Sequence, residues 1–220
     1  MPTVSLKRVL LGAIAVVTER ARTLAKALVI PTVVYLLLAN VATTAQEPSL
    51  LSFIVALITI LLHTVIAVTT HRIVILGPEA MGEWGLNRWT MRETRFAMFL
   101  MIMGIAVGFI LLFGLAAQPY SLAIAIPGAL LFITFFSLVF PAAAIDETID
   151  ITAAWRLAKG HLLPLFLCVC IFPMLLTIPL VLIQMIPGVS FISPIFDVAI
   201  NVLTIAALSI IYTEIRRLEG

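Results

Sequence analysis

Positive charge in this chain is confined to four short stretches, and the three gaps between them contain no Lys or Arg. All thirteen cations fall in these clusters, which are Lys7, Arg8, Arg20, Arg22 and Lys26; Arg72, Arg88, Arg92 and Arg95; Arg156 and Lys159; and Arg216 and Arg217. Each gap is apolar and long enough to cross a bilayer twice, at about 20 residues a crossing. The four clusters are therefore expected on one side of a membrane, and the positive-inside tendency makes that side the cytoplasm.

The composition agrees with a bilayer protein and excludes an ordinary soluble one. Of the 220 residues, 63% are hydrophobic and 11% are charged, whereas soluble domains carry roughly 25% charged residues. Because the cations lie on one side, we expect anionic lipid headgroups as the partner and no nucleic acid. A membrane-protein partner is also compatible with the pattern.

We predict an all-α fold, a polytopic six-helix transmembrane bundle that forms one integral membrane domain over residues 1–220. Each predicted span has close to the ~20 residues that a bilayer requires. The spans are expected at about 24–45, 50–76, 96–117, 122–143, 162–186 and 194–215. Both termini would then be cytoplasmic, and the outer loops would be short.

Residues 1–23 precede the first span and predict an interfacial amphipathic helix. Its apolar residues recur at helical spacing, and the cations lie opposite them. The apolar face comprises Leu6, Val9, Leu10, Ala13, Val17, Ala21 and Leu24. We expect this helix in the headgroup layer with its cations toward phosphate. A cleaved signal peptide is the alternative, but Thr18, Glu19 and Arg20 interrupt the apolar run.

A weak internal similarity suggests that the six spans form three helix-hairpin repeats. Residues 24–31 match residues 157–164 at four of eight positions, in both cases where an amphipathic segment turns into a span. Residues 84–95 form a comparable lead-in to the middle pair. Parallel repeats about the membrane normal would follow, although short apolar segments also match through composition alone.

Four segments resemble a known family. They are residues 67–77 (AVTTHRIVILG), 140–146 (FPAAAID), 154–160 (AWRLAKG) and 209–216 (SIIYTEIR). With the amphipathic leader they are similar to the glycerophosphodiester phosphodiesterase membrane-domain-like family and related six-helix bacterial inner-membrane proteins. The resemblance implies a fold and an inner-membrane location. It implies no phosphodiesterase activity, because the catalytic domain is a separate soluble barrel and His71-Arg72 is followed here by Ile73, not Gly.

No familiar catalytic or metal motif occurs in the sequence. There is no Gly-rich phosphate loop, no His-Glu-x-x-His and no Gly-x-Ser-x-Gly. Cys168 and Cys170 would lie about 200° apart on a regular helix and could not bind one metal. We therefore expect no cofactor and no metal site.

Three acidic residues after the fourth span allow two interpretations. Asp146, Glu147 and Asp150 could bind a cation together with His161. We favour a capping role, in which these carboxylates meet the unsatisfied backbone donors at the start of a helix through Trp155.

Polar residues inside predicted spans are candidate binding residues, since ionisable groups in a bilayer are costly and face the bundle interior. His63 lies near the centre of the second span and could bind a solute or relay a proton, or simply pack against a polar neighbour. Asp197 and Asn201 share a face of the sixth span. They could form an outer vestibule for a cation, or Asp197 could cap the helix.

His71 and Arg72 lie at the end of the second span and also allow two interpretations. They could bind a phosphate at the headgroups, or they could be a basic stop near the helix C-terminus, which we favour. Gly104 and Gly108 permit close helix approach, either within the bundle, which we favour, or in a dimer. Pro127, Pro164, Pro173 and Pro179 predict bent spans.

We predict a non-enzymatic membrane protein that organises lipids or partner proteins. Its cytoplasmic surface would use five cations toward headgroups, namely Arg8, Arg22, Lys26, Arg156 and Lys159. The second hypothesis is a small transporter or channel whose path involves His63 and Asp197. The third is an intramembrane enzyme acting on lipid headgroups at His71, Arg72 and His161.

Overall fold

The computed structural model describes residues 4–44, 49–81, 89–117, 120–147, 150–184 and 193–219. These residues are helical with short turns, and no strand occurs among them. Six segments are long and apolar enough to span a membrane, which makes the chain a multi-pass membrane protein and confirms the predicted all-α fold class. They are Ala21–Ala39, Leu50–Leu76, Met91–Ala117, Leu122–Ala144, Leu162–Leu182 and Pro194–Glu219.

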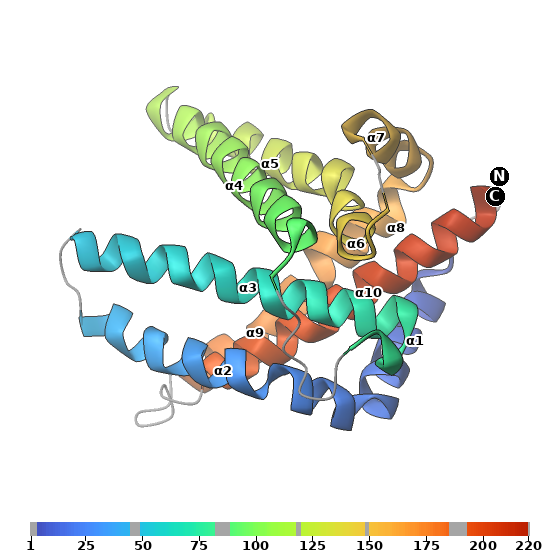
Figure 1. Ribbon diagram of the computed structural model, residues 1–220. Helices are drawn as coiled ribbons and strands as arrows, with labels where there is room; N and C mark the ends of the chain where they lie inside the picture. The colour runs from blue at the N-terminus through green and yellow to red at the C-terminus, as the bar shows by residue number, and fades with distance from the viewer. Residues whose placement is uncertain are drawn as a thin grey trace.

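The spans are arranged as three hairpins with short helices between them (Figure 1). The first hairpin is α2 (Ala21–Thr44) and α3 (Leu50–Leu76), preceded by α1 (Leu6–Glu19) and followed by a 3₁₀ turn at Pro78–Ala80. The second is α4 (Met91–Ala117) with α5 (Leu122–Phe136) and α6 (Val139–Ala144). The third follows α7 (Ile151–Gly160) and comprises α8 (Leu162–Phe166), a π-helical turn (Leu167–Ile171), α9 (Phe172–Gln184) and α10 (Ser193–Glu219).

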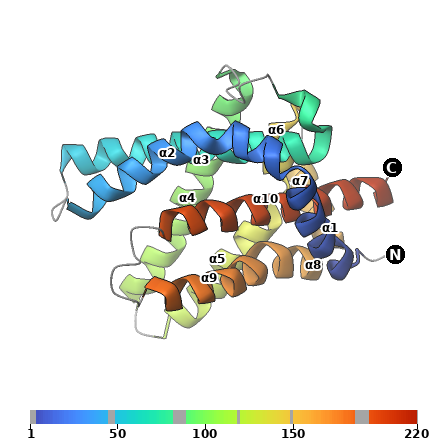
Figure 2. The same ribbon diagram turned by 90° about the horizontal axis from the view of Figure 1, so that it is seen from below.

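Both termini lie at the same end of the bundle, together with α1 and α7 (Figures 1 and 2). The joined ends of α2 and α3, of α4 and α5, and of α9 and α10 lie at the opposite end. An even number of spans between the termini requires this arrangement. We call the end with the termini the terminal end of the bundle.

Helix α4 begins at Met91, five residues before the predicted span. The reason is a capping box: the Glu93 carboxylate accepts hydrogen bonds from the Thr90 backbone N–H at 2.7 Å and from the Thr90 hydroxyl at 2.5 Å. The helix therefore begins more than one turn before the apolar segment. This extra turn carries Arg92, Glu93 and Arg95 out of the loop and onto the helix.

The predicted amphipathic helix is present as α1, but its apolar face is buried in the protein. Val9 and Ala13 are fully buried and belong to the same core cluster as Ile211 and Ile215 of α10. The apolar face that was expected to enter the headgroup layer packs on α10 instead. Burial of these side chains against a helix stabilises α1 at a fixed position on the bundle.

Helices α3 and α10 run parallel and in register. His63 contacts Asn201 and His71 contacts Ser209, so two pairs eight residues apart on each helix have the same separation of 138 residues along the chain. Each helix is the second of its hairpin. Parallel alignment of equivalent helices is what the predicted parallel repeats require. The lead-in predicted for the middle pair, residues 84–95, includes Trp84 and Arg88, which lie outside the described residues.

Close packing within the second hairpin occurs at a glycine other than the predicted pair. A Cβ at Gly114 would lie 2.5 Å from the Cβ of Ala125 on α5. A Cβ at Gly104 or Gly108 would meet no atom within 4 Å. The prediction that Gly104 and Gly108 pack closely within the bundle is therefore wrong, and α4 uses Gly114 to approach α5.

The fifth span is irregular near one of its predicted prolines. The five residues before Phe172 form a π-helical turn, and the Phe172 backbone N–H donates to the Leu167 carbonyl. Pro173 has no N–H for the carbonyl four residues earlier, and the wider turn accommodates this loss. Pro127 and Pro179 lie inside α5 and α9, which continue through them.

Candidate functional site

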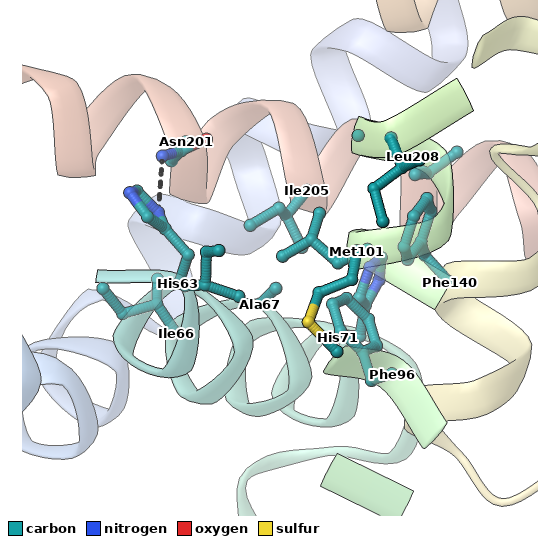
Figure 3. Close-up of a pocket in the computed structure, with 14 residues that line it drawn as sticks. His63, Ile66, Ala67, His71, Phe96, Met101, Phe140, Asn201, Ile205 and Leu208 are labelled. Carbon is teal, nitrogen blue, oxygen red and sulfur yellow. Dashed lines mark hydrogen bonds between the residues drawn. The ribbon is translucent and has the colours of Figure 1, made fainter. Parts of the chain in front are cut away.

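A cleft of about 740 Å³ lies between α3, α4 and α10 (Figure 3). Its walls are mostly apolar, with aliphatic side chains along α3 and α10 and with Phe96 and Phe140 at one end. Three polar side chains line it: His63 and His71 from α3, and Asn201 from α10. The two histidines are eight residues apart on one helix, which places them on the same face about 12 Å apart along the axis. The cleft therefore has a polar residue toward each end.

His63, Asn201 and Asp197, all predicted as binding candidates, come together at one end of this cleft. The Asn201 side-chain nitrogen lies 3.4 Å from Nδ1 of His63 (Figure 3). Asp197, one turn earlier on α10, is close enough for its charge to act on His63. The ring of Tyr35 on α2 meets the His63 ring edge-on at a centroid distance of 5.2 Å. Nothing in the sequence pattern had indicated Tyr35.

His71 is buried at the other end, where its Nδ1 lies 2.7 Å from the Ser209 hydroxyl of α10. Its ring also contacts Phe96 of α4, with the ring centroids 6.0 Å apart. Arg72 follows one position later on the helix and points elsewhere, toward Asp146 and the carbonyls of Ala80 and Ala144. The side chains of His71 and Arg72 thus have different partners in the protein, Ser209 for His71 and Asp146 for Arg72. The basic-stop interpretation is incomplete, because α3 continues to Leu76.

Asp146 is the centre of a cluster of three arginines that we call the arginine cluster. Its carboxylate lies 2.9 Å from Arg92, 3.7 Å from Arg72 and 3.9 Å from Arg95. Arg92 is further held by Glu93 at 2.8 Å. Asp146 adopts a left-handed backbone conformation with φ of 62°, which a non-glycine residue rarely does. The cluster joins α3, α4 and the residues that follow α6.

The capping interpretation of the three acidic residues is correct for one of them. Asp150 accepts a hydrogen bond from the Ala153 backbone N–H at 2.5 Å and caps α7. Asp146 belongs to the arginine cluster, and Glu147 accepts hydrogen bonds from Tyr212 and Arg216 of α10. Sequence could not indicate these partners, because they lie 51 to 74 residues away for Asp146 and 65 to 69 residues away for Glu147.

His161 lies apart from the other two histidines, at the junction of α7 and α8, and is buried. The structure gives it no contact with His71 or Arg72. Among the described residues, no group of three His, Cys, Asp or Glu side chains is placed to hold a metal ion. The three residues of the enzyme hypothesis therefore do not converge.

The five cations predicted to face headgroups are all exposed. We call Arg8, Arg22, Lys26, Arg156 and Lys159 the surface cations. They lie on α1, on the first turns of α2 and on α7, and within the described part of the chain none of them has a hydrogen bond or an ion pair. By contrast, the Arg20 guanidinium donates hydrogen bonds to the carbonyls of Ile73 and Val74. These bonds connect the α1–α2 junction to α3.

No family model, curated protein or solved structure matches this chain. The functional interpretation therefore depends on the geometry described above.

Proposed function

We propose that this protein is a non-enzymatic membrane component that gathers anionic lipids around the terminal end of its bundle through the surface cations. The observation that carries the proposal is the contrast between two groups of cations. Arg72, Arg92, Arg95 and Arg216 are each paired with a carboxylate of the same chain. Among the residues that the structure describes, the surface cations have no such partner, which leaves them available to pair with lipid phosphates.

Positive potential at the surface of the protein comes mainly from cations that are not paired with a carboxylate. A cation already paired with a carboxylate contributes little to the field outside the protein. An unpaired Lys or Arg near an anionic membrane surface is worth about 1 kcal/mol of attraction. Since α1 and α7 are packed on α10 and α5, the backbone that carries Arg8, Arg156 and Lys159 is already ordered. Binding of a lipid phosphate would therefore order the cationic side chains but no further backbone.

The proposal extends to location and orientation. We place the protein in a bacterial inner membrane with the terminal end in the cytoplasm, in keeping with the positive-inside tendency and with the family that the sequence resembles. Anionic lipids in the cytoplasmic leaflet would then meet the surface cations directly. A partner protein with an acidic face could use the same surface.

The test replaces all five surface cations with Gln and measures the lipids that co-purify with the protein by mass spectrometry. The matched control exchanges each Arg for Lys and each Lys for Arg, which keeps the charge. We expect the Gln variant to lose its enrichment of anionic over zwitterionic lipid, because about 1 kcal/mol per cation is removed. The control should keep that enrichment. Equal enrichment in the two variants would rule the proposal out.

A second candidate function is transport of a small solute or proton. It is favoured by the contact of His63 with Asn201 and by the nearby charge of Asp197. Ionisable groups that face each other inside a bilayer commonly mark pathways. The His63 variants described in the Discussion test it.

A further inference from the structure

We infer that the cleft between α3, α4 and α10 is a site for one phospholipid, with an acyl chain inside the cleft and the phosphate at the arginine cluster. This site shares no residue with the surface cations. It would hold a single lipid from within the bilayer, whereas the surface cations would attract many lipids at the membrane surface.

The cleft lies in the membrane-spanning part of the bundle and is open toward lipid along α4. Met101 and Ile105 of α4 line it and are 40% and 60% exposed. Gly104 lies between them, and the position where its Cβ would be is empty to 4 Å. In a bilayer the surrounding solvent is hydrocarbon, so an apolar opening of this kind takes an acyl chain. An empty space would forfeit the dispersion contacts of its lining.

The arginine cluster lies directly beyond one end of the cleft. Phe96 lines that end, and Arg92 is one turn earlier on the same face of α4. His71 lines it from α3, and Arg72 is the next residue. Phe140 lines it from α6, and Asp146 follows shortly after that helix. A chain bound in the cleft would therefore leave its headgroup at the arginine cluster.

The charges of the arginine cluster favour an anionic headgroup. Three arginines meet two carboxylates, Glu93 and Asp146, so the cluster carries a net charge of +1. Arg95 is 45% exposed, and its nearest approach to Asp146 is 3.9 Å, which is longer than the 2.9 Å ion pair between Arg92 and the same carboxylate. A phosphate oxygen can accept hydrogen bonds from this exposed guanidinium group.

The first experiment blocks the cleft. In Gly104→Phe a bulky side chain enters the cleft, whereas Gly108, one turn later on the same helix, is not among the residues that line the cleft. Native mass spectrometry after reconstitution with phosphatidylglycerol should show one retained lipid on the wild-type protein and on Gly108→Phe. We expect about a tenfold loss of that species in Gly104→Phe. Equal retention by the two variants would overturn the proposal.

The second experiment tests the phosphate first on the wild-type protein, where the result does not depend on how a variant folds, and then on two variants of Arg95. Diacylglycerol has the same chains and no phosphate, and it should compete with bound phosphatidylglycerol about tenfold less well than phosphatidylglycerol itself. The Arg95→Gln variant should lose that preference and Arg95→Lys should keep most of it. Equal competition by the two lipids would overturn the phosphate assignment. If the wild-type protein instead binds a second protein chain and Gly104→Phe loses it, the cleft is not a lipid site and the proposal is overturned.

The outcome is distinguishable from failure of the proposed function. Neutralising the surface cations should change the enrichment of anionic lipid and leave the single retained lipid in place. Blocking the cleft should remove the single lipid and leave the enrichment in place.

Discussion

At the residue scale, each of the two histidines that line the cleft contacts a polar side chain of α10. His63 has Asn201, and His71 has Ser209. Hydrogen bonds between helices in a membrane are worth about 0.6 to 2 kcal/mol each. The two pairs fix the register of α3 against α10, because a shift of either helix would break both contacts together.

Replacement of His63 separates packing from function. His63→Leu should lower the stability in detergent by about 1 kcal/mol, because Asn201 would lose its partner. His63→Gln can still bond to Asn201 and should be close to wild type in stability. Gln does not titrate, so a proton relay would fail in it. Thermal unfolding and an uptake assay on both variants distinguish a packing role of His63 from a role in transport. Loss of uptake in His63→Gln at unchanged stability would favour the transporter over the lipid-binding proposal.

Replacement of Asp146 tests the arginine cluster. Asp146→Asn can keep the left-handed backbone but loses the charge that three arginines share. Hydrogen bonds to charged groups contribute about 1.5 to 3 kcal/mol. Because the Asp146 side chain is 50% exposed, screening reduces this, and we expect a loss of about 1 kcal/mol.

Asp150→Asn is the matched control for that measurement. Asp150 has one role, capping α7, and Asn caps a helix as well as Asp does. Its free energy of unfolding should change by less than about 0.5 kcal/mol. Equal losses in the two variants would show that the arginine cluster does not stabilise the fold.

Part of this residue-scale picture was available from the sequence. The cost of an ionisable group in a bilayer predicts that His63 faces other helices, and His63 is half-buried against Asn201 of α10 and Tyr35 of α2. These partners could not be predicted, because they lie on other helices. The same reason explains why the sequence favours a capping role for Asp146. Spacing along the chain indicates a helix that begins nearby, but it cannot indicate arginines more than 50 residues away.

At the element scale, six helices and two amphipathic segments follow from apolar length and helical period. Apolar length and helical period do not show which surface an amphipathic helix covers. The apolar stripe of α1 fits either lipid or protein, and in this chain it covers α10. Likewise, the Gly104/Gly108 spacing resembles a packing motif, yet only the distances to neighbouring helices show that Gly114 is the point of close approach.

Gly114 provides the prediction for this scale. Gly114→Ala should destabilise the protein by about 1 to 3 kcal/mol, because the added Cβ would lie 2.5 Å from that of Ala125 and must push α5 away. Gly108→Ala adds the same atom to the same helix with no neighbour within 4 Å. It should leave stability unchanged or raise it, since Ala favours a helix. Thermal unfolding of both variants is the measurement, and equal stability would contradict close packing at Gly114.

At the scale of the whole molecule, an even number of spans brings the termini, α1 and α7 to one end (Figure 1). Cysteine accessibility in intact cells tests the orientation. A cysteine at Tyr120, whose side chain is 84% exposed at the opposite end, should react with an impermeant reagent from outside. Cysteines at Lys159 and Arg217 should react only after permeabilisation. Labelling of a cysteine at Lys159 from outside would show that the protein has the opposite orientation in the membrane. The predicted topology also puts Glu47 and Gly188 on the outer side of the membrane and Arg88 on the inner side; these three residues are not among those that the structure describes.

The most direct test of the proposed function measures how salt changes the lipid shell of the intact protein. In nanodiscs with equal amounts of phosphatidylglycerol and phosphatidylcholine, we predict enrichment of phosphatidylglycerol around the wild-type protein. That enrichment should fall as salt rises from about 0.1 M to 1 M, because the screening length drops from about 10 Å to 3 Å. The variant with all five surface cations changed to Gln should show little enrichment at either salt concentration. Enrichment that persists in that variant, or that does not respond to salt in the wild type, would contradict the account.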